Sequence, residues 1–212
     1  MTQTSSPMSF TRFEAFSDGV FAIAITLLVI EIHVPDITGH SFSEAMQELW
    51  HLAPHFISYL TSFMVIGVIW LNHNALFHFV KRVDRTILLL NLVLLMCIAF
   101  IPFTTALVGN HPNSQPAVFL YGLWLTLLGV VWNTLWACMV RRHILPTNLA
   151  PRAAVRAASL WSVGYPIGYL TAAMLSFLHP VISVILYALI PLIYLLPSPI
   201  DALLRGLGPS EG

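Results

Sequence analysis

Six long apolar segments constrain the fold of this chain more than any other feature. They run over residues 14–34, 48–76, 85–109, 117–140, 155–178 and 181–198. A helix of about 20 apolar residues is long enough to cross the hydrocarbon core of a bilayer. The chain is 58% hydrophobic and only 8% charged, whereas soluble domains carry about 25% charged residues. The sequence therefore predicts an all-α membrane protein with six transmembrane helices, and residues 1–212 form a single predicted domain.

Positively charged residues alternate between the connections of these segments. All nine Lys and Arg residues lie before the first segment, around the second and fourth connections, or in the carboxyl-terminal tail. The first, third and fifth connections contain none. Because basic residues accumulate in cytoplasmic loops, this pattern predicts a multi-pass protein of the cell membrane with both termini in the cytoplasm. It also supports the number of spans, since removing one would break the alternation.

Composition and missing motifs argue against several function classes. The formal net charge is zero, which gives no reason to expect a nucleic-acid partner. Cys97 and Cys138 lie in apolar stretches without CxxC spacing, so we expect neither a disulfide framework nor a metal site there. No H-E-x-x-H or G-x-S-x-G motif occurs, and we expect no enzyme activity and no cofactor. The amino terminus lacks a basic region followed by a cleavage site, so no cleaved signal peptide is expected.

The first apolar segment has two chemically different faces. At about 100° per residue, one face is apolar, and it comprises Phe16, Gly19, Val20, Ile23, Leu27, Ile30 and Val34. Asp18 points about 140° away from Ile23, and Thr26 lies at the border of the apolar face. A carboxylate at the edge of a membrane span is costly unless it is paired or lines a functional path. Lipid or neighbouring helices could also cover such an apolar face.

Motifs in the first three segments resemble one channel family. They are RxxxFSDGVFAIA at 12–24, WLNHNxLF at 70–77, DxxxLLLNL at 84–92 and PFT at 102–104. Together they are similar to the endolysosomal-type potassium channels, and specifically to their prokaryotic six-span branch. The last three segments match that family only in hydropathy.

The resemblance implies a potassium-permeable, leak-type cation channel. In that family four identical subunits surround a pore that the first helix of each subunit lines. There is no carbonyl filter, and this chain has no TVGYG-like segment. The resemblance places the constriction at Ile23, with Leu27 and Ile30 further outward, and makes Thr26 a candidate hydroxyl layer facing the ions. Rings of such apolar side chains gate a pore by excluding water.

Polar residues of the same motifs form a second predicted group. It comprises Arg12, Ser17, Asp18, Trp70, His73 and Asn91, which we place at similar depth on the cytoplasmic side. Buried polar groups must hydrogen-bond to one another. The resemblance makes this network structural, fixing the first span against the second and third. A catalytic or proton-relay role is the competing interpretation.

Two further alternatives stay open at this point. A secondary transporter, possibly proton-coupled through Asp18 or His73, is the alternative to a channel, although the pair of broken helices typical of transporters is not evident. Glu48, His51 and His55 share one helical face on the outer side and are a weak candidate for a zinc site. The remaining expected partners are potassium ions, the lipid bilayer and further copies of the chain.

Overall fold

All regular structure in the described part of the chain is helical. The computed structural model describes residues 10–34, 41–78, 80, 84–142 and 151–196. Its helices are α1 (Phe10–Ile30), α2 (Phe42–Trp50), α3 (Ala53–His78), α4 (Arg85–Ala99), α5 (Ile101–Asn110), α6 (Gln115–Arg141), α7 (Arg152–Leu175) and α8 (Pro180–Tyr194). The predicted all-α fold class is confirmed.

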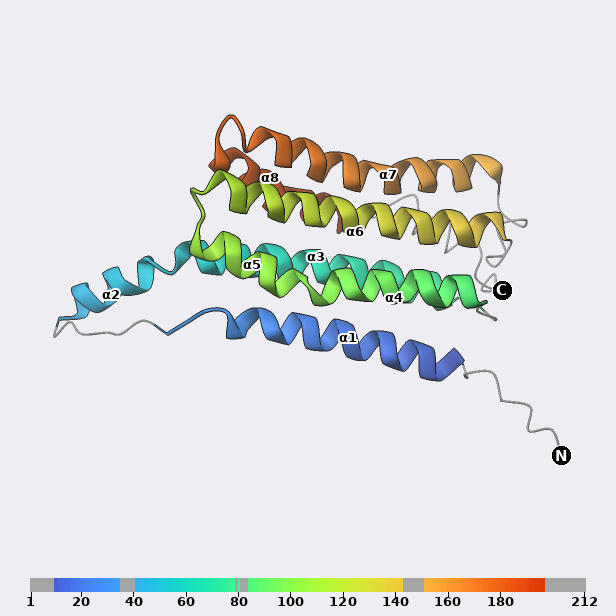
Figure 1. The fold of residues 1–212 in the computed structure, drawn as a ribbon, viewed down its shortest axis with the longest axis horizontal. Coiled ribbons are helices and arrows are strands. Elements are labelled where there is room, and N and C mark those ends of the chain that lie inside the picture. The colour runs from blue at the N-terminus through green and yellow to red at the C-terminus, as the bar shows by residue number, and fades with distance from the viewer. Residues whose placement is uncertain (1–9, 35–40, 79, 81–83, 143–150, 197–212) are drawn as a thin grey trace.

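The long helices form an elongated bundle with α1 and α7 on opposite sides. Helix α1 packs against α3, α4 and α5, while α6 packs against α4, α5, α7 and α8. Successive long helices alternate in direction, so the start of α1, the start of α4 and the end of α6 lie at one end of the bundle (Figure 1). At the opposite end, α2 extends away from the bundle and leads into α3 (Figure 1).

The helices correspond to the six predicted segments but differ from them in length and in where they begin and end. By length and composition, four helical segments are able to cross a membrane, namely 11–30, 53–78, 85–110 and 115–141. Helix α7 carries Arg152 and Arg156 near its start, and α8 is apolar but shorter. The predicted second span began at residue 48, but α2 ends at Trp50 and the spanning helix begins at Ala53. The last two residues of the predicted 181–198 segment lie outside the described residues.

The third span is broken into α4 and α5 at Phe100, two residues before Pro102. Proline has no N–H to donate and its ring clashes with the preceding turn, which interrupts the helical hydrogen bonds. Neighbouring groups satisfy the carbonyls around the break. The Trp124 indole of α6 donates to the Cys97 carbonyl at 2.9 Å, and the hydroxyl of Thr105 donates to that of Ile101 at 2.8 Å. Pro166 and Pro191 lie inside α7 and α8, and both helices continue through them.

Helix α4 starts at a side-chain cap, at the end of the bundle where α1 begins and α6 ends (Figure 1). The Asp84 carboxylate accepts a hydrogen bond from the backbone N–H of Ile87 at 2.9 Å and forms an ion pair with Arg142 at the end of α6. The Ile87 N–H, helped by Arg142, lowers the pKa of Asp84 below its ordinary value. This pairing ties the start of α4 to the end of α6.

A buried polar core joins the central helices in the half of the bundle where α3 begins. The Ser62 hydroxyl of α3 lies 2.6 Å from that of Thr105 and 2.8 Å from that of Tyr121. The Tyr187 hydroxyl of α8 donates to the Val118 carbonyl of α6 at 3.0 Å. Each of these hydrogen bonds joins two helices. The low dielectric of the buried interior strengthens them electrostatically.

Close packing of α6 against α7 and α8 depends on Gly122. A Cβ atom at this position would lie 2.0 Å from the Tyr187 hydroxyl and 2.8 Å from the Ala173 Cβ. We expect Gly122→Ala to lower the stability of the purified protein by about 1–3 kcal/mol, the usual cost of overpacking. Gly67→Ala is the control, because a Cβ there would meet nothing within 4 Å. Thermal unfolding in detergent measures both, and equal melting temperatures for the two variants would contradict this account.

Candidate functional site

One face of α1 is buried against the bundle and organises the candidate site. Its members recur every three or four residues, as one side of a helix requires. They are Phe13, Ser17, Phe21, Ala24 and Leu28, all at most 4% exposed. These residues pack on α3, α4 and α5. The opposite side of α1 is left without a partner inside the described chain.

The predicted pore-facing residues lie on this unpartnered side. The side chain of Ile23 is 60% exposed, that of Leu27 40% and that of Ile30 67%. Thr26 is also exposed, and its hydroxyl donates back to its own helix, at 3.0 Å from the Ala22 carbonyl and 2.9 Å from that of Ile23. The Thr26 oxygen keeps free lone pairs for a cation or water. Apolar side chains of this kind exclude water where they line a narrow pore.

Three of the predicted polar residues form a buried hydrogen-bonded chain between α1, α3 and α4. Asn91 is completely buried, and its amide nitrogen donates to the Ser17 hydroxyl at 3.0 Å. Its amide oxygen accepts from His73 Nε2 at 2.8 Å. Ser17 in turn donates to the Phe13 carbonyl at 3.0 Å. The chain fixes α1 against both neighbouring helices.

Aromatic side chains enclose this series of hydrogen bonds. The motif analysis did not identify this feature. The ring centroids of His73 and Phe77 are 4.4 Å apart, those of Phe13 and Phe77 5.1 Å, and those of Phe21 and His73 5.3 Å. The spacing of Phe13, Ser17 and Phe21 at four-residue intervals was the available sequence signal. The aromatic rings keep lipid and water away from the amide, which strengthens its hydrogen bonds.

Asp18 and Trp70 form a separate, exposed contact. The Trp70 indole donates to the Asp18 carboxylate at 3.0 Å, and both side chains are exposed within the chain. Asp18 is therefore not a buried member of the network, because its position on α1 turns it away from Asn91. Arg12 is also exposed and has no hydrogen bond or ion pair among the described residues. The six predicted residues thus do not form one continuous network inside a single described chain.

An open pocket lies beside this contact at the amino-terminal end of α1. It has a volume of about 340 Å³ and is lined by Thr11, Glu14, Ala15, Asp18, His73, Asn74 and Phe77. Two carboxylates therefore share its wall. Such a surface attracts cations and raises their local concentration.

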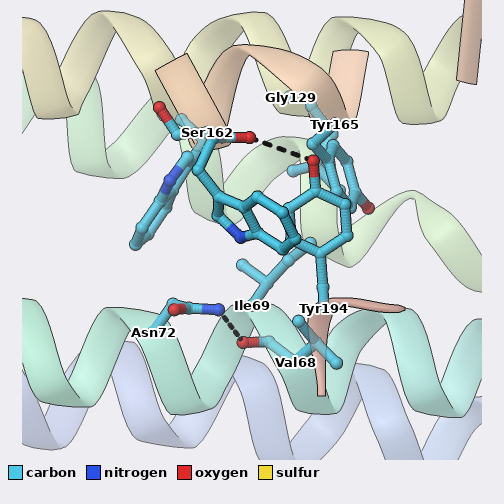
Figure 2. Close-up of a pocket in the computed structure, with 10 residues that line it drawn as sticks. Val68, Ile69, Asn72, Gly129, Ser162, Tyr165 and Tyr194 are labelled. Carbon is cyan, nitrogen blue, oxygen red and sulfur yellow. Dashed lines mark hydrogen bonds between the residues drawn. The ribbon is translucent and has the colours of Figure 1, made fainter. Parts of the chain in front are cut away.

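A second, much smaller cavity lies between α3, α6, α7 and α8 (Figure 2). Its volume is about 40 Å³. Two of its polar groups donate to backbone carbonyls, Asn72 to Val68 at 2.8 Å and Tyr194 to Trp161 at 3.0 Å (Figure 2). Its size suits a few water molecules. None of its lining residues comes from α1, which argues against a part in the predicted ion pathway.

The structure describes the side chains of two of the three residues of the zinc hypothesis, His51 and His55. His55 Nε2 lies 3.3 Å from the Asn110 amide oxygen, and His51 is exposed. The side chain of Glu48 lies outside the described residues. Among the residues that the structure describes, no three His, Cys, Asp or Glu side chains are placed to hold a metal ion. The zinc hypothesis stays untested.

Comparison with known proteins connects this arrangement to a family. Residues 12–102 match the family described as endosomal/lysosomal potassium channel TMEM175. A potassium channel of Streptomyces collinus is 38% identical over 168 residues, 74% of this chain and 79% of that protein. A potassium channel of Chamaesiphon minutus is 40% identical over 179 residues, 82% of this chain and 87% of that protein.

A solved structure shares the fold as well. The crystal structure of a lysosomal potassium-selective channel TMEM175 homolog from Chamaesiphon minutus has a TM-score of 0.76 and 36% identity to this chain. The similarity covers 88% of this chain and 96% of that one. The family match, the sequence identities and the common fold agree, and the chain belongs to the TMEM175 family.

Proposed function

We propose that this chain is the subunit of a potassium-permeable, leak-type cation channel. Four copies place α1 around a common axis, and Ile23, Leu27 and Ile30 form successive apolar rings. The observation that carries the proposal is the unpartnered apolar face of α1, opposite the side that is buried in the bundle. The relatives named as potassium channels support the choice of ion.

In this proposal the Ile23 ring is the main barrier to ion flow. Four isoleucine side chains leave no hydrogen-bonding partner for water, so a cation meets a large desolvation cost there. Thr26 supplies hydroxyl oxygens next to the barrier, and the carboxylates of Glu14 and Asp18 concentrate cations near the end of α1. The whole chain acts as one domain, and it is a channel rather than an enzyme.

In the proposed topology the protein spans the cell membrane several times, and both termini lie in the cytoplasm. The alternating positions of the nine Lys and Arg residues support it. Under this topology the Ser17–Asn91–His73 chain lies in the cytoplasmic half of the membrane. It holds α1 at a fixed depth and angle, which a ring of four equivalent helices needs.

Assembly and conduction can be tested on the same purified sample. Native mass spectrometry in detergent is expected to give four copies of the 23.6 kDa chain, because one chain offers a single pore-facing helix and closed cyclic symmetry is the usual solution. Planar-bilayer recordings with potassium and sodium on opposite sides should give unitary currents that need no coupled gradient. A monomer at every concentration would exclude the axial pore, and flux that requires a proton gradient would favour the secondary transporter.

A further inference from the structure

Residues of α6 and α7 line a large groove. These two helices lie on the side of the bundle away from α1 (Figure 1). Its volume is about 850 Å³, and it extends along α6 from Val130 to Arg142. The twelve residues from Val130 to Arg141 span about 17 Å at the rise of an α-helix. The hydrocarbon core of a bilayer is about 30 Å thick. The groove therefore has the length of roughly one leaflet.

The inner part of the groove offers mostly apolar contacts. Val130 and Val163 line it and are 49% and 41% exposed. Its hydroxyl groups already donate within the protein, since Thr134 donates to the Val130 carbonyl and Ser159 to that of Val155, both at 2.8 Å. A ligand in this part would meet side-chain carbon.

The end of the groove near the last residues of α6 is cationic. Arg141 and Arg142 both line it at the end of α6. Arg142 is occupied by the ion pair with Asp84. Arg141 is exposed, and no ion pair or hydrogen bond of its side chain exists among the described residues. The apolar groove therefore ends at one guanidinium, that of Arg141, which has no partner among the described residues.

We propose that this groove binds an anionic phospholipid, with the phosphate on Arg141 and an acyl chain along Val130 and Val163. A guanidinium matches the geometry of phosphate oxygens and binds them through paired hydrogen bonds. Basic pockets between membrane helices hold anionic head groups in this way. Under the proposed topology the lipid belongs to the cytoplasmic leaflet.

The proposed site is independent of the ion pathway. Its lining residues come from α6 and α7 alone, and α1 contributes none. A bound lipid would contact both α6 and α7, whose connection at 143–150 lies outside the described residues. Loss of lipid binding would therefore leave the proposal for α1 untouched, and the reverse also holds.

Native mass spectrometry of the delipidated protein, titrated with phosphatidylglycerol or phosphatidylcholine, tests the site. We expect tighter binding of phosphatidylglycerol, with Arg141→Gln weakening it about fivefold, the effect of one basic group near an anionic surface. Arg141→Lys should retain most of the preference. Arg85→Gln is the matched control, because Arg85 is an exposed arginine at the same end of the bundle but does not line the groove.

The acyl-chain part has its own test. Val163→Trp should place a bulky side chain in the apolar part of the groove and weaken phosphatidylglycerol binding. The melting temperature of the lipid-free protein shows whether the variant is folded. Equal affinities for the two lipids, or equal losses in Arg141→Gln and Arg85→Gln, would overturn the proposal. Unchanged affinity in folded Val163→Trp would also overturn it.

Discussion

Replacing Ile23 with serine is expected to raise the potassium current through each assembled channel about tenfold, which corresponds to a barrier lowered by about 1.4 kcal/mol. The substitution replaces four apolar side chains of the proposed constriction with hydroxyls that hold water. The preference for potassium over sodium should fall at the same time, because hydrated ions pass a wetted ring with less discrimination. Single-channel recordings under bi-ionic conditions measure both quantities.

Leu28→Ser provides the matched control for this experiment. Leu28 lies on the same helix but is completely buried against the bundle. The change should destabilise the protein by about 2–5 kcal/mol, as loss of a large core side chain does, without raising the current of those channels that assemble. Equal conductance for wild type and Ile23→Ser in channels of verified assembly would show that this face does not line the path.

Asn91→Leu should destabilise the protein strongly, because this one amide satisfies groups on two other helices. Without it, the ring nitrogen of buried His73 loses its acceptor and the hydroxyl of Ser17 loses its donor. A buried polar group left without its partner costs about 1–3 kcal/mol. Chemical unfolding in detergent, followed by circular dichroism, measures the loss.

Asp18→Asn separates the two interpretations of the polar residues. Because Asp18 is exposed and an asparagine oxygen can still accept from the Trp70 indole, we expect a stability change below about 1 kcal/mol. A fully stable Asn91→Leu variant that has lost a proton-dependent current would instead favour a relay through His73. The pair of variants therefore tests the structural role by stability and the relay by current.

The sequence predicted the parts of the site that local periodicity determines. Helical spacing places Ile23, Leu27 and Ile30 on one face of α1, and the structure leaves that face exposed. The motif residues Ser17, His73 and Asn91 also meet, since the short connection between the second and third segments returns Asn91 to the level of His73. The family match at residues 12–102 covers this same part of the chain.

Features that depend on neighbouring helices were not predictable. Pro102, Pro166 and Pro191 look alike in the sequence, but only the first interrupts its helix, where groups such as the Trp124 indole satisfy nearby carbonyls. Arg141 and Arg142 are adjacent and chemically identical, and only the position of Asp84 distinguishes them. Such differences arise from tertiary contacts, which a single sequence does not specify.

The exposed side of α1 also bears on how copies of the chain meet. Only 28% of its most apolar stretch is buried within the chain, against 39% and 44% for the next two spans. In water such a surface would drive association, but lipid tails are as apolar as leucine and solvate it equally well. The exposed α1 surface therefore adds no hydrophobic free-energy cost to a single copy in a bilayer. Its oligomeric state should depend on the number of copies per lipid molecule, and diluting the protein with lipid should dissociate it.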